Sequence, residues 1–170
     1  KVESFMKTYL ITGGCGFIGS NFIHFLFENQ IANQIINLDK MTYAGNLENL
    51  VSIESNKDYH FIEGDICNEE IVQEILYEYR PDVIVHFAAE SHVDRSIDGP
   101  AEFIQTNVLG TLCLLHESNQ WLKNSDSKIK DDFRFIHVST DEVYGSLGEE
   151  GKFLETTPYD PSSPYSASKA

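Results

Sequence analysis

The chain has 170 residues, of which 41% are hydrophobic and 23% charged, so it is long enough for one domain with a substantial core and is not disordered overall. Its formal net charge of −15 disfavours nucleic-acid binding through a basic surface, because the chain would repel a phosphate backbone at long range. No apolar run reaches the length of a membrane span. We therefore expect a cytoplasmic protein with neither a nucleic-acid nor a membrane partner.

The three cysteines, Cys15, Cys67 and Cys113, lie far apart in the sequence and form no Cys-x-x-Cys pair. A disulfide scaffold or a zinc site is therefore not expected. The histidines are scattered as well. His86 belongs to a predicted strand, where packing explains it better than metal binding does, so we expect no metal site.

A cluster of glycines follows the first predicted strand. The apolar run 9–11 leads into the segment 12–20, Thr-Gly-Gly-Cys-Gly-Phe-Ile-Gly-Ser, which indicates a buried strand, a tight turn and an apolar helix. Gly13 suits the sharp turn, Gly16 the close approach to a pyrophosphate, and Gly19 the packing of the helix on the sheet. The Gly-x-Gly-x-x-Gly pattern alone is a weak signal, since it also arises by chance.

The second predicted strand, 34–38, strengthens that signal because it ends at Asp39, twenty positions after Gly19. A carboxylate at this position can accept hydrogen bonds from the ribose hydroxyls of adenosine and repel a 2′-phosphate, which favours NAD over NADP. Lys40 weakens that preference. The alternative is that Asp39 only ends a strand at the surface.

Strands alternate with helices along the rest of the chain. Further strands are predicted at 59–63, 83–87 and 133–138, with one helix between Asn68 and Pro81 and a longer one from Pro100 to about Trp121. This alternation predicts an α/β fold, a Rossmann-like, doubly wound parallel sheet with helices on both faces.

Two polar segments connect the later elements. The stretch 123–132 is expected to be an exposed, mobile connection, and a loop rich in glycine and proline leads to Tyr165. Ligands of open α/β sheets bind beyond the carboxyl ends of the strands. We therefore expect one crevice to collect the residues that follow the five strands: the glycine turn, Asp39, Asp65, 88–91 and 139–142.

Tyr165 and Lys169 are four positions apart, which places them on one face of a helix. A positive charge beside the phenol would lower its pKa from about 10 towards neutrality. The tyrosine could then take a proton from a substrate hydroxyl while hydride leaves the adjoining carbon. The alternative is an ordinary amphipathic first turn after Pro164, but the preceding glycine turn and Ser-Thr strand end favour catalysis.

Asp141 and Glu142 are adjacent carboxylates that follow a buried strand. Both are expected to face the crevice, where burial and mutual repulsion would leave one protonated and the other ionised, so that one donates a proton and the other removes one. A dehydration needs this division, because hydroxide leaves poorly unless it is protonated. The alternative is a pair of solvated loop residues.

Five stretches together resemble the extended short-chain dehydrogenase/reductase superfamily and, within it, the dTDP-glucose 4,6-dehydratases. The glycine turn is shared by the whole superfamily, whereas the Ala-Glu-Ser-His-Val-Asp-Arg-Ser segment and the Thr-Asp-Glu triplet are narrower signatures. The matching stretches span almost the whole chain: 12–19, 39–46, 87–97, 139–145 and 163–170.

The resemblance implies an NAD site. Residues after the first strand would contact the pyrophosphate, those after the second would hold the adenosine ribose, and those after the third would flank the adenine. The implied cofactor-binding residues are Gly13, Gly16, Phe17, Ile18, Gly19, Asp39, Lys40, Met41, Thr42, Asp65, Ile66, Phe87, Ala88, Ala89, Ser91, Thr106, Tyr165 and Lys169.

The resemblance also implies the catalytic roles. Tyr165 would take the proton of the sugar C4 hydroxyl as hydride passes to NAD⁺, and Lys169 would bind the nicotinamide ribose. Glu142 would then remove the C5 proton, Asp141 would protonate the leaving C6 hydroxyl, and hydride would return to C6. Thr140 and Ser91 would hydrogen-bond the sugar. No external reductant would be needed.

Members of this superfamily continue beyond the position of Ala170 into a smaller domain that binds the nucleotide diphosphate of the sugar. We therefore expect residues 1–170 to be an incomplete NAD-binding Rossmann-like domain of a longer polypeptide, inactive alone. The nucleotide base stays open among dTDP, UDP and CDP. A homodimer through a helix bundle is implied, built from the helix after Pro100 and the one near Tyr165.

Two other functions remain possible from the sequence. A nucleotide-sugar 4-epimerase would use Tyr165, Lys169 and NAD but would have no use for Asp141 and Glu142. A catalytically silent NAD-binding module would bind the cofactor without turnover, although the presence of all four side chains argues against it.

Overall fold

The structure, a computed structural model, describes residues 6–170. Five strands form one parallel sheet in the order β3-β2-β1-β4-β5. The order reverses between β1 and β4, and this reversal is the position at which open α/β sheets bind ligands. All five predicted strands are confirmed: β1 (Lys7–Thr12), β2 (Ala32–Asp39), β3 (Tyr59–Glu63), β4 (Val83–His86) and β5 (Arg134–His137).

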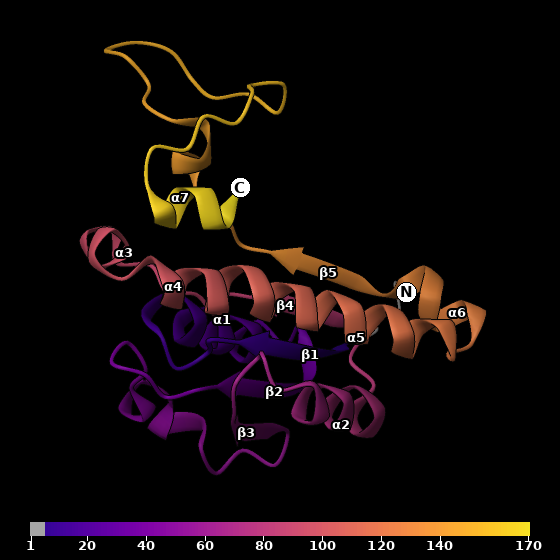
Figure 1. The fold of residues 1–170 in the computed structure, drawn as a ribbon. Helices are drawn as coiled ribbons and strands as arrows, with labels where there is room; N and C mark the ends of the chain where they lie inside the picture. Colours follow the sequence, from indigo (N-terminus) through magenta and orange to yellow (C-terminus); the bar gives the residue numbers. More distant parts are fainter. Residues whose placement is uncertain (1–5) are drawn as a thin grey trace.

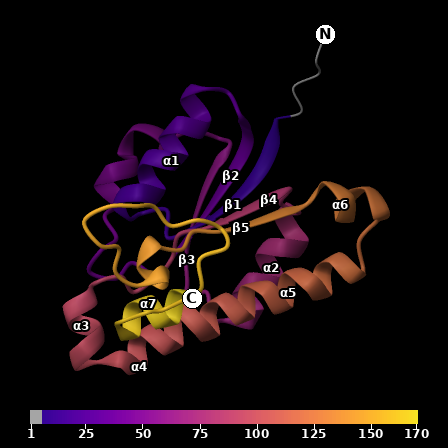
Figure 2. The same cartoon turned by 90° about the horizontal axis from the view of Figure 1, so that it is seen from above.

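Helices cover both faces of the sheet, as predicted (Figure 1). Seen from above, α1 (Phe17–Glu28) lies on one side of the strands, while α2 (Glu69–Tyr79) and α5 (Thr111–Lys123) lie on the other (Figure 2). The remaining helical segments are η1 (Leu47–Ile53), α3 (Val93–Asp98), α4 (Pro100–Phe103), η2 (Ile104–Gly110), α6 (Ser127–Asp132), η3 (Asp141–Tyr144) and α7 (Pro164–Lys169).

Two hydrophobic clusters hold these layers together because successive side chains of a strand point to opposite faces. Leu10 of β1 belongs to the cluster under α2 and α5, and its neighbour Ile11 belongs to the cluster under α1. Ile23 of α1 and Leu114 of α5 are likewise fully buried. A parallel sheet buried on both faces explains why its strands are apolar runs rather than alternating ones.

Helix α2 begins and ends where the sequence predicts. The Asn68 side chain accepts hydrogen bonds from the backbone N–H groups of Glu70 and Ile71, at 3.0 and 3.2 Å. Arg80 ends the helix in the left-handed region at φ 48°, directly before Pro81. The cap and the stop therefore fix the helix that leads into β4.

The expectation for the stretch 123–132 is wrong in part, because 127–132 form α6. Ile129 packs against the core cluster that contains Trp121, and the Lys130 ammonium donates to the Lys123 carbonyl at 3.1 Å. One apolar side chain among many charges is a weak sequence signal, yet it is enough to dock this short helix.

The long helix predicted from Pro100 is continuous in course but changes its winding. Residues 104–110 form a π-helical segment between α4 and α5. At its end the hydroxyl of Thr111, the first residue of α5, donates to the Asn107 carbonyl at 2.6 Å, and Gly110 packs so closely that a Cβ there would lie 2.5 Å from the Ile66 side chain. Such segments often occur at functional sites.

Candidate active site

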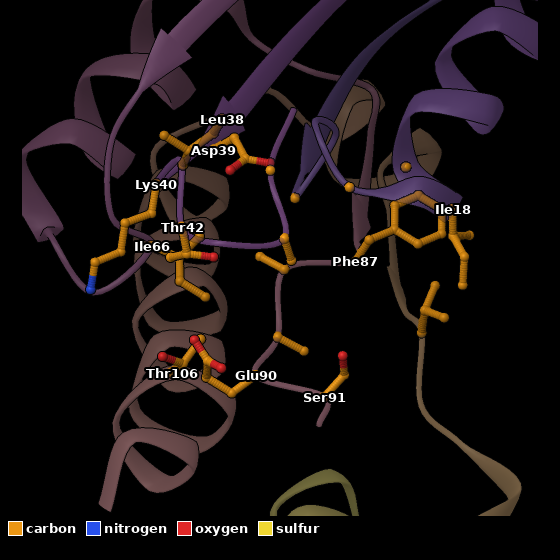
Figure 3. A pocket seen from close by; sticks show the side chains of 18 of the residues that line it. Ile18, Leu38, Asp39, Lys40, Thr42, Ile66, Phe87, Glu90, Ser91 and Thr106 are labelled. Carbon is orange, nitrogen blue, oxygen red and sulfur yellow. The ribbon is translucent and has the colours of Figure 1, made fainter. Parts of the chain in front are cut away.

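A cavity of about 410 Å³ opens at the carboxyl ends of the strands. Figure 3 shows Asp39 and Lys40 on one side of it, Phe87 and Ile18 on the other, and Glu90, Ser91 and Thr106 further along. Every residue assigned above to cofactor binding lines the cavity except Met41. Glu90 and Ser139, which were expected in the crevice, also line it. The sequence reasoning missed five further lining residues: Leu38, Ala44, Gly45, Gly64 and Val138.

The glycine turn is shaped by space as well as by backbone conformation. Gly13 has φ +73°, and a Cβ there would lie 2.6 Å from the backbone nitrogen of Ala88. A Cβ at Gly19 would collide with the backbone of Gly13 and Gly14, so this residue allows close packing. For a Cβ at Gly16, the nearest atom outside its chain neighbours would be the Gly13 carbonyl oxygen, at 3.4 Å. Gly16 therefore leaves room beside the cavity, as a bound group would need.

The first turn of α1 presents uncapped amides to the cavity. Gly16 supplies no side-chain cap, and no acidic residue lies in the first turn. Phe17 and Ile18, which begin the helix, line the cavity. A helix N-terminus carries free N–H groups and a partial positive charge, so this end suits an anionic pyrophosphate.

Asp39 has a structural role that the sequence reasoning did not predict. Its side chain is largely buried, and its two carboxylate oxygens accept hydrogen bonds from the backbone N–H groups of Cys15 and Met41, both at 2.9 Å. Met41 thus faces Asp39 through its amide. The carboxylate ties the glycine turn to the end of β2 while keeping lone pairs free for ribose hydroxyls.

Lys40 and Asp65 join the ends of β2 and β3. The Lys40 ammonium lies 2.7 Å from the Asp65 carboxylate. Burial opposes ionisation of Asp65, but the hydrogen bond and charge of Lys40 and the Cys67 amide together hold its pKa below the usual value. The pair forms the outer edge of the cavity on this side.

Asn107 connects the two halves of the site, and the sequence reasoning missed it. Its side-chain oxygen accepts from the Glu90 backbone N–H at 2.9 Å, and its amide donates to the Glu90 carbonyl at 2.9 Å and to the Ser168 hydroxyl at 2.8 Å. This buried side chain therefore joins the loop that carries Ser91 to helix α7. The sequence sign of this role is a single asparagine among the apolar positions of the predicted helix that follows Pro100.

Tyr165 and Lys169 both line the cavity from α7, whose first turn carries a capping box between Ser163 and Ser166. The expected lowering of the phenol pKa is wrong for this structure. Burial raises the pKa of Tyr165, the charges of Glu142 and Asp141 raise it further, and only a hydrogen bond with Thr140 lowers it.

Lys169 is the most deeply buried lysine side chain of the site, with only 6% of its surface exposed. Burial lowers its pKa to about 8. Its ammonium lies 3.1 Å from Nε2 of His137, and its backbone carbonyl accepts from the Ser139 hydroxyl at 2.8 Å. Lys169 is therefore held by the end of β5 at both its backbone and its side chain.

Thr140, Asp141 and Glu142 lie at the start of η3, outside the cavity lining. The Thr140 hydroxyl accepts from the Glu142 backbone N–H at 3.3 Å and caps this short helix. Both acids are exposed, so the expected burial of this pair is wrong. They remain close enough to Tyr165 for their charges to act on the phenol. The structure thus brings tyrosine, threonine and both acids together at the rim.

Between residues 6 and 170, no group of three or more His, Cys, Asp or Glu side chains is placed to hold a metal ion. Over the same range, no helix is both long and apolar enough to cross a membrane. His86 is packed, as expected: it is fully buried between the hydroxyls of Thr12 and Thr111.

A family model described as GDP-mannose 4,6 dehydratase matches residues 10–170. The chain belongs to this family. The dTDP-glucose 4,6-dehydratase of Xanthomonas campestris pv. campestris (strain B100) is 57% identical over 165 residues, which cover 97% of this chain and 46% of that protein. The resemblance stated from the motifs is therefore confirmed. The chain spans about half the length of the curated family relatives it matches.

Solved structures of relatives share the fold. A dTDP-glucose 4,6-dehydratase from Streptomyces venezuelae, with NAD and TYD bound, superposes with a TM-score of 0.85 at 43% identity and covers 95% of this chain and 48% of its own. A UDP-glucose 4-epimerase from Thermus thermophilus in complex with NAD gives 0.79 at 31%, covering 95% and 47%. The epimerase is the more distant of the two in sequence.

Proposed function

We propose that this protein is an NAD-dependent hydro-lyase that converts dTDP-glucose to dTDP-4-keto-6-deoxyglucose, with residues 1–170 forming its cofactor-binding, Rossmann-like part. One observation carries the proposal. Tyr165 and Lys169 reach the cavity, and Asp141 and Glu142 lie near enough to act on the Tyr165 phenol. The similarity to proteins named dTDP-glucose 4,6-dehydratase supports the choice of thymidine.

The cavity fits a dinucleotide. Gly16 leaves open space beside the uncapped amides of α1, and these amides would bind the pyrophosphate. Asp39 would accept hydrogen bonds from the adenosine ribose, and its negative charge disfavours a 2′-phosphate. Asp65 and Ile66, just beyond the end of β3, would flank the adenine.

Tyr165 would take the proton from the C4 hydroxyl of the sugar, with Thr140 as its hydrogen-bond partner. Lys169 would bind the nicotinamide ribose from the same face of α7, and Ser91 and Thr140 would hydrogen-bond the sugar. When bound, NAD⁺ supplies a positively charged ring that can accept the C4 hydride, give it back at C6, and favour the phenolate form of Tyr165. The ketone at C4 makes the C5 proton acidic.

Glu142 would remove the C5 proton, and Asp141 would give a proton to the C6 hydroxyl as it leaves as water. Both carboxylates are exposed in this structure, so a sugar seated over them is what would exclude water from the pair. Glu142 would return its proton to C5 as hydride reaches C6, and the proton taken by Tyr165 would pass back to Asp141 through solvent, so the net change is loss of one water.

A 4-epimerase is the second candidate, since the epimerase fold is similar and would use the same tyrosine and lysine. It gives no role to the two acids beside the phenol. The test is incubation of the complete protein with dTDP-, UDP- and CDP-glucose, followed by mass analysis. A 4-keto-6-deoxy product has lost one water. An isomer of unchanged mass supports the epimerase instead, and tight NAD binding without any conversion supports a silent module.

We further propose that two copies associate through the helix that runs through η2 and α5. Ile104, Val108, Leu112 and Leu115 are each between 40% and 57% exposed, and their spacing places them along one side of this helix. Helix α7 contacts η2 and would extend the surface. Sedimentation of the complete protein would show a dimer, and Leu112→Glu would give a monomer. We also place the enzyme in the cytoplasm, where its three free thiols would stay reduced.

A further inference from the structure

The ammonium of Lys169 has an unusual neighbour. Its Nζ lies 3.1 Å from Nε2 of His137, at the last residue of β5. Within the part of the chain that the structure describes, no Asp or Glu carboxylate lies within 4.0 Å of Lys169. A buried ammonium is usually paired with a carboxylate, so here the imidazole takes that place.

The chemistry of this contact fixes the protonation of His137. An ammonium can only donate hydrogen bonds, so Nε2 of His137 must be the unprotonated ring nitrogen and Nδ1 must carry the proton. Burial and the charge of Lys169 both lower the pKa of His137, which keeps the ring neutral near pH 7. The contact is therefore a charge-assisted hydrogen bond from lysine to a neutral imidazole.

The ring of His86 stacks against the ring of His137. The two histidines are partners across β4 and β5, and their rings stack at 5.1 Å with an angle of 22°. The Thr111 hydroxyl uses its proton on the Asn107 carbonyl, so it must accept from Nε2 of His86 at 2.9 Å. Nδ1 of His86 then accepts from the Thr12 hydroxyl at 2.6 Å. The hydrogen bonds of both ring nitrogens thus fix the orientation of the His86 ring, which gives the His137 ring a rigid surface to stack on.

We propose that His137 is a positioning residue, whose Nε2 holds the Lys169 ammonium at the edge of the cavity while the fixed ring of His86 supports it. Its effect on turnover rests on the proposed function, since Lys169 acts there on the nicotinamide ribose. Without the acceptor, the ammonium would lose a partner inside a poorly solvated site. Lys169 would then release its proton more readily and leave its position beside the ribose.

The proposal predicts a pH dependence. The titratable groups that face the His137 ring are Lys169 on α7 and His86 on β4. His86 stays neutral because both nitrogens are engaged, so only His137 changes the contact on acidification. A proton on Nε2 removes the acceptor and places two positive charges side by side. Turnover should therefore fall on the acid side as His137 is protonated.

The experiment compares two variants of the complete protein. His137→Phe keeps a flat ring over His86 but has no acceptor, whereas His137→Gln keeps an oxygen acceptor. His24→Phe is the matched control, because the His24 ring is also partly exposed and contacts a backbone carbonyl, that of Asn49, at 2.7 Å. Thermal melting first shows that each variant is folded. The Lys169 ammonium is then titrated by NMR with ¹³C-labelled lysine, using Lys169→Arg to assign the signal.

We expect Lys169 in His137→Phe to titrate about one pH unit lower than in the parent protein, since a hydrogen bond to a charged group is worth roughly that much. His137→Gln should restore most of the difference, and His24→Phe should show none. In turnover, kcat of His137→Phe should fall about tenfold. The decrease of kcat at low pH that comes from protonation of His137 should be absent in this variant. An unchanged Lys169 titration in a folded His137→Phe overturns the proposal, whatever the activity. Absence of dehydratase activity in the parent protein overturns the proposed function alone.

Discussion

The two ends of the cavity are built differently. At the nucleotide end, the glycine turn and Asp39 are held by the backbone: Gly13 fits against Ala88, and both Asp39 oxygens accept amide hydrogens. At the end proposed to be catalytic, Asp141 and Glu142 lie at the rim, exposed on a short 3₁₀ helix next to α7. Backbone contacts within the chain fix the first end, whereas under the proposed function the second would need a bound sugar to exclude water.

Under the proposed function, this difference separates the residues that bind the cofactor from those that carry out the chemistry. Changes at the glycine turn should alter the fold and cofactor binding together, because the same backbone serves both. Changes at the rim should remove chemistry and leave the fold intact, since exposed side chains contribute little to stability.

The largest effect is expected for Tyr165→Phe in the complete protein. Loss of the phenolic proton acceptor should lower kcat by about 10³-fold. NAD affinity, measured by fluorescence titration, should change less than about threefold, because one hydroxyl at the rim contributes little to dinucleotide binding. A variant that retains more than a tenth of the activity would show that the phenol is not the base.

Gly13→Ala should damage both properties at once. Its φ of +73° and a Cβ 2.6 Å from the Ala88 backbone predict a loss of about 3 kcal/mol in the free energy of unfolding, together with loss of NAD binding. Gly148→Ala is the control, since nothing lies within 4 Å of a Cβ there. Urea unfolding measures the stability of both variants. Equal stability of the two would contradict the account of the turn.

Much of the nucleotide end was predictable because its signals are local. Glycine spacing, an apolar strand and an acid at its tip are adjacent in the chain and follow from backbone geometry, so Gly13, Gly16 and Asp39 were found from the sequence alone. What escaped prediction depends on contacts between distant residues. Asn107 reaches the loop at Glu90 and the hydroxyl of Ser168, sixty-one positions away, and no local pattern encodes that. The exposure of Asp141 and Glu142 escaped for the same reason.

Acid should destabilise the fold through His86. Its burial lowers its pKa from 6.5 to about 3. Below pH 6.5 the unfolded chain binds a proton on this ring and the folded chain does not, so stability falls as the pH falls and the loss ends only near pH 3. We expect about 2 kcal/mol of loss between about pH 6.5 and about pH 5 from this group. His86→Asn, followed by chemical unfolding at each pH, should remove that part of the slope.

The smallest effect is expected for Lys40→Met. The Lys40 side chain is 56% exposed and that of Asp65 31%, so water screens their ion pair. The free energy of unfolding should change by less than about 1 kcal/mol. A change above about 2 kcal/mol would show that the edge between β2 and β3 is held by charge rather than by its backbone.

The central claim of the proposed function is that the hydride removed from C4 would return to C6 of the same sugar and that the acids at the rim would eliminate water between the two hydride steps. The complete protein is incubated in D₂O, once with ordinary dTDP-glucose and once with dTDP-glucose carrying deuterium at C4, and the product is analysed by NMR. The account predicts a 4-keto-6-deoxy sugar, with the C4 label transferred to C6 and solvent deuterium at C5. In Glu142→Gln the product and the exchange at C5 should both be lost. Return of the label to C4 in an isomer of unchanged mass, with no exchange at C5, would contradict it.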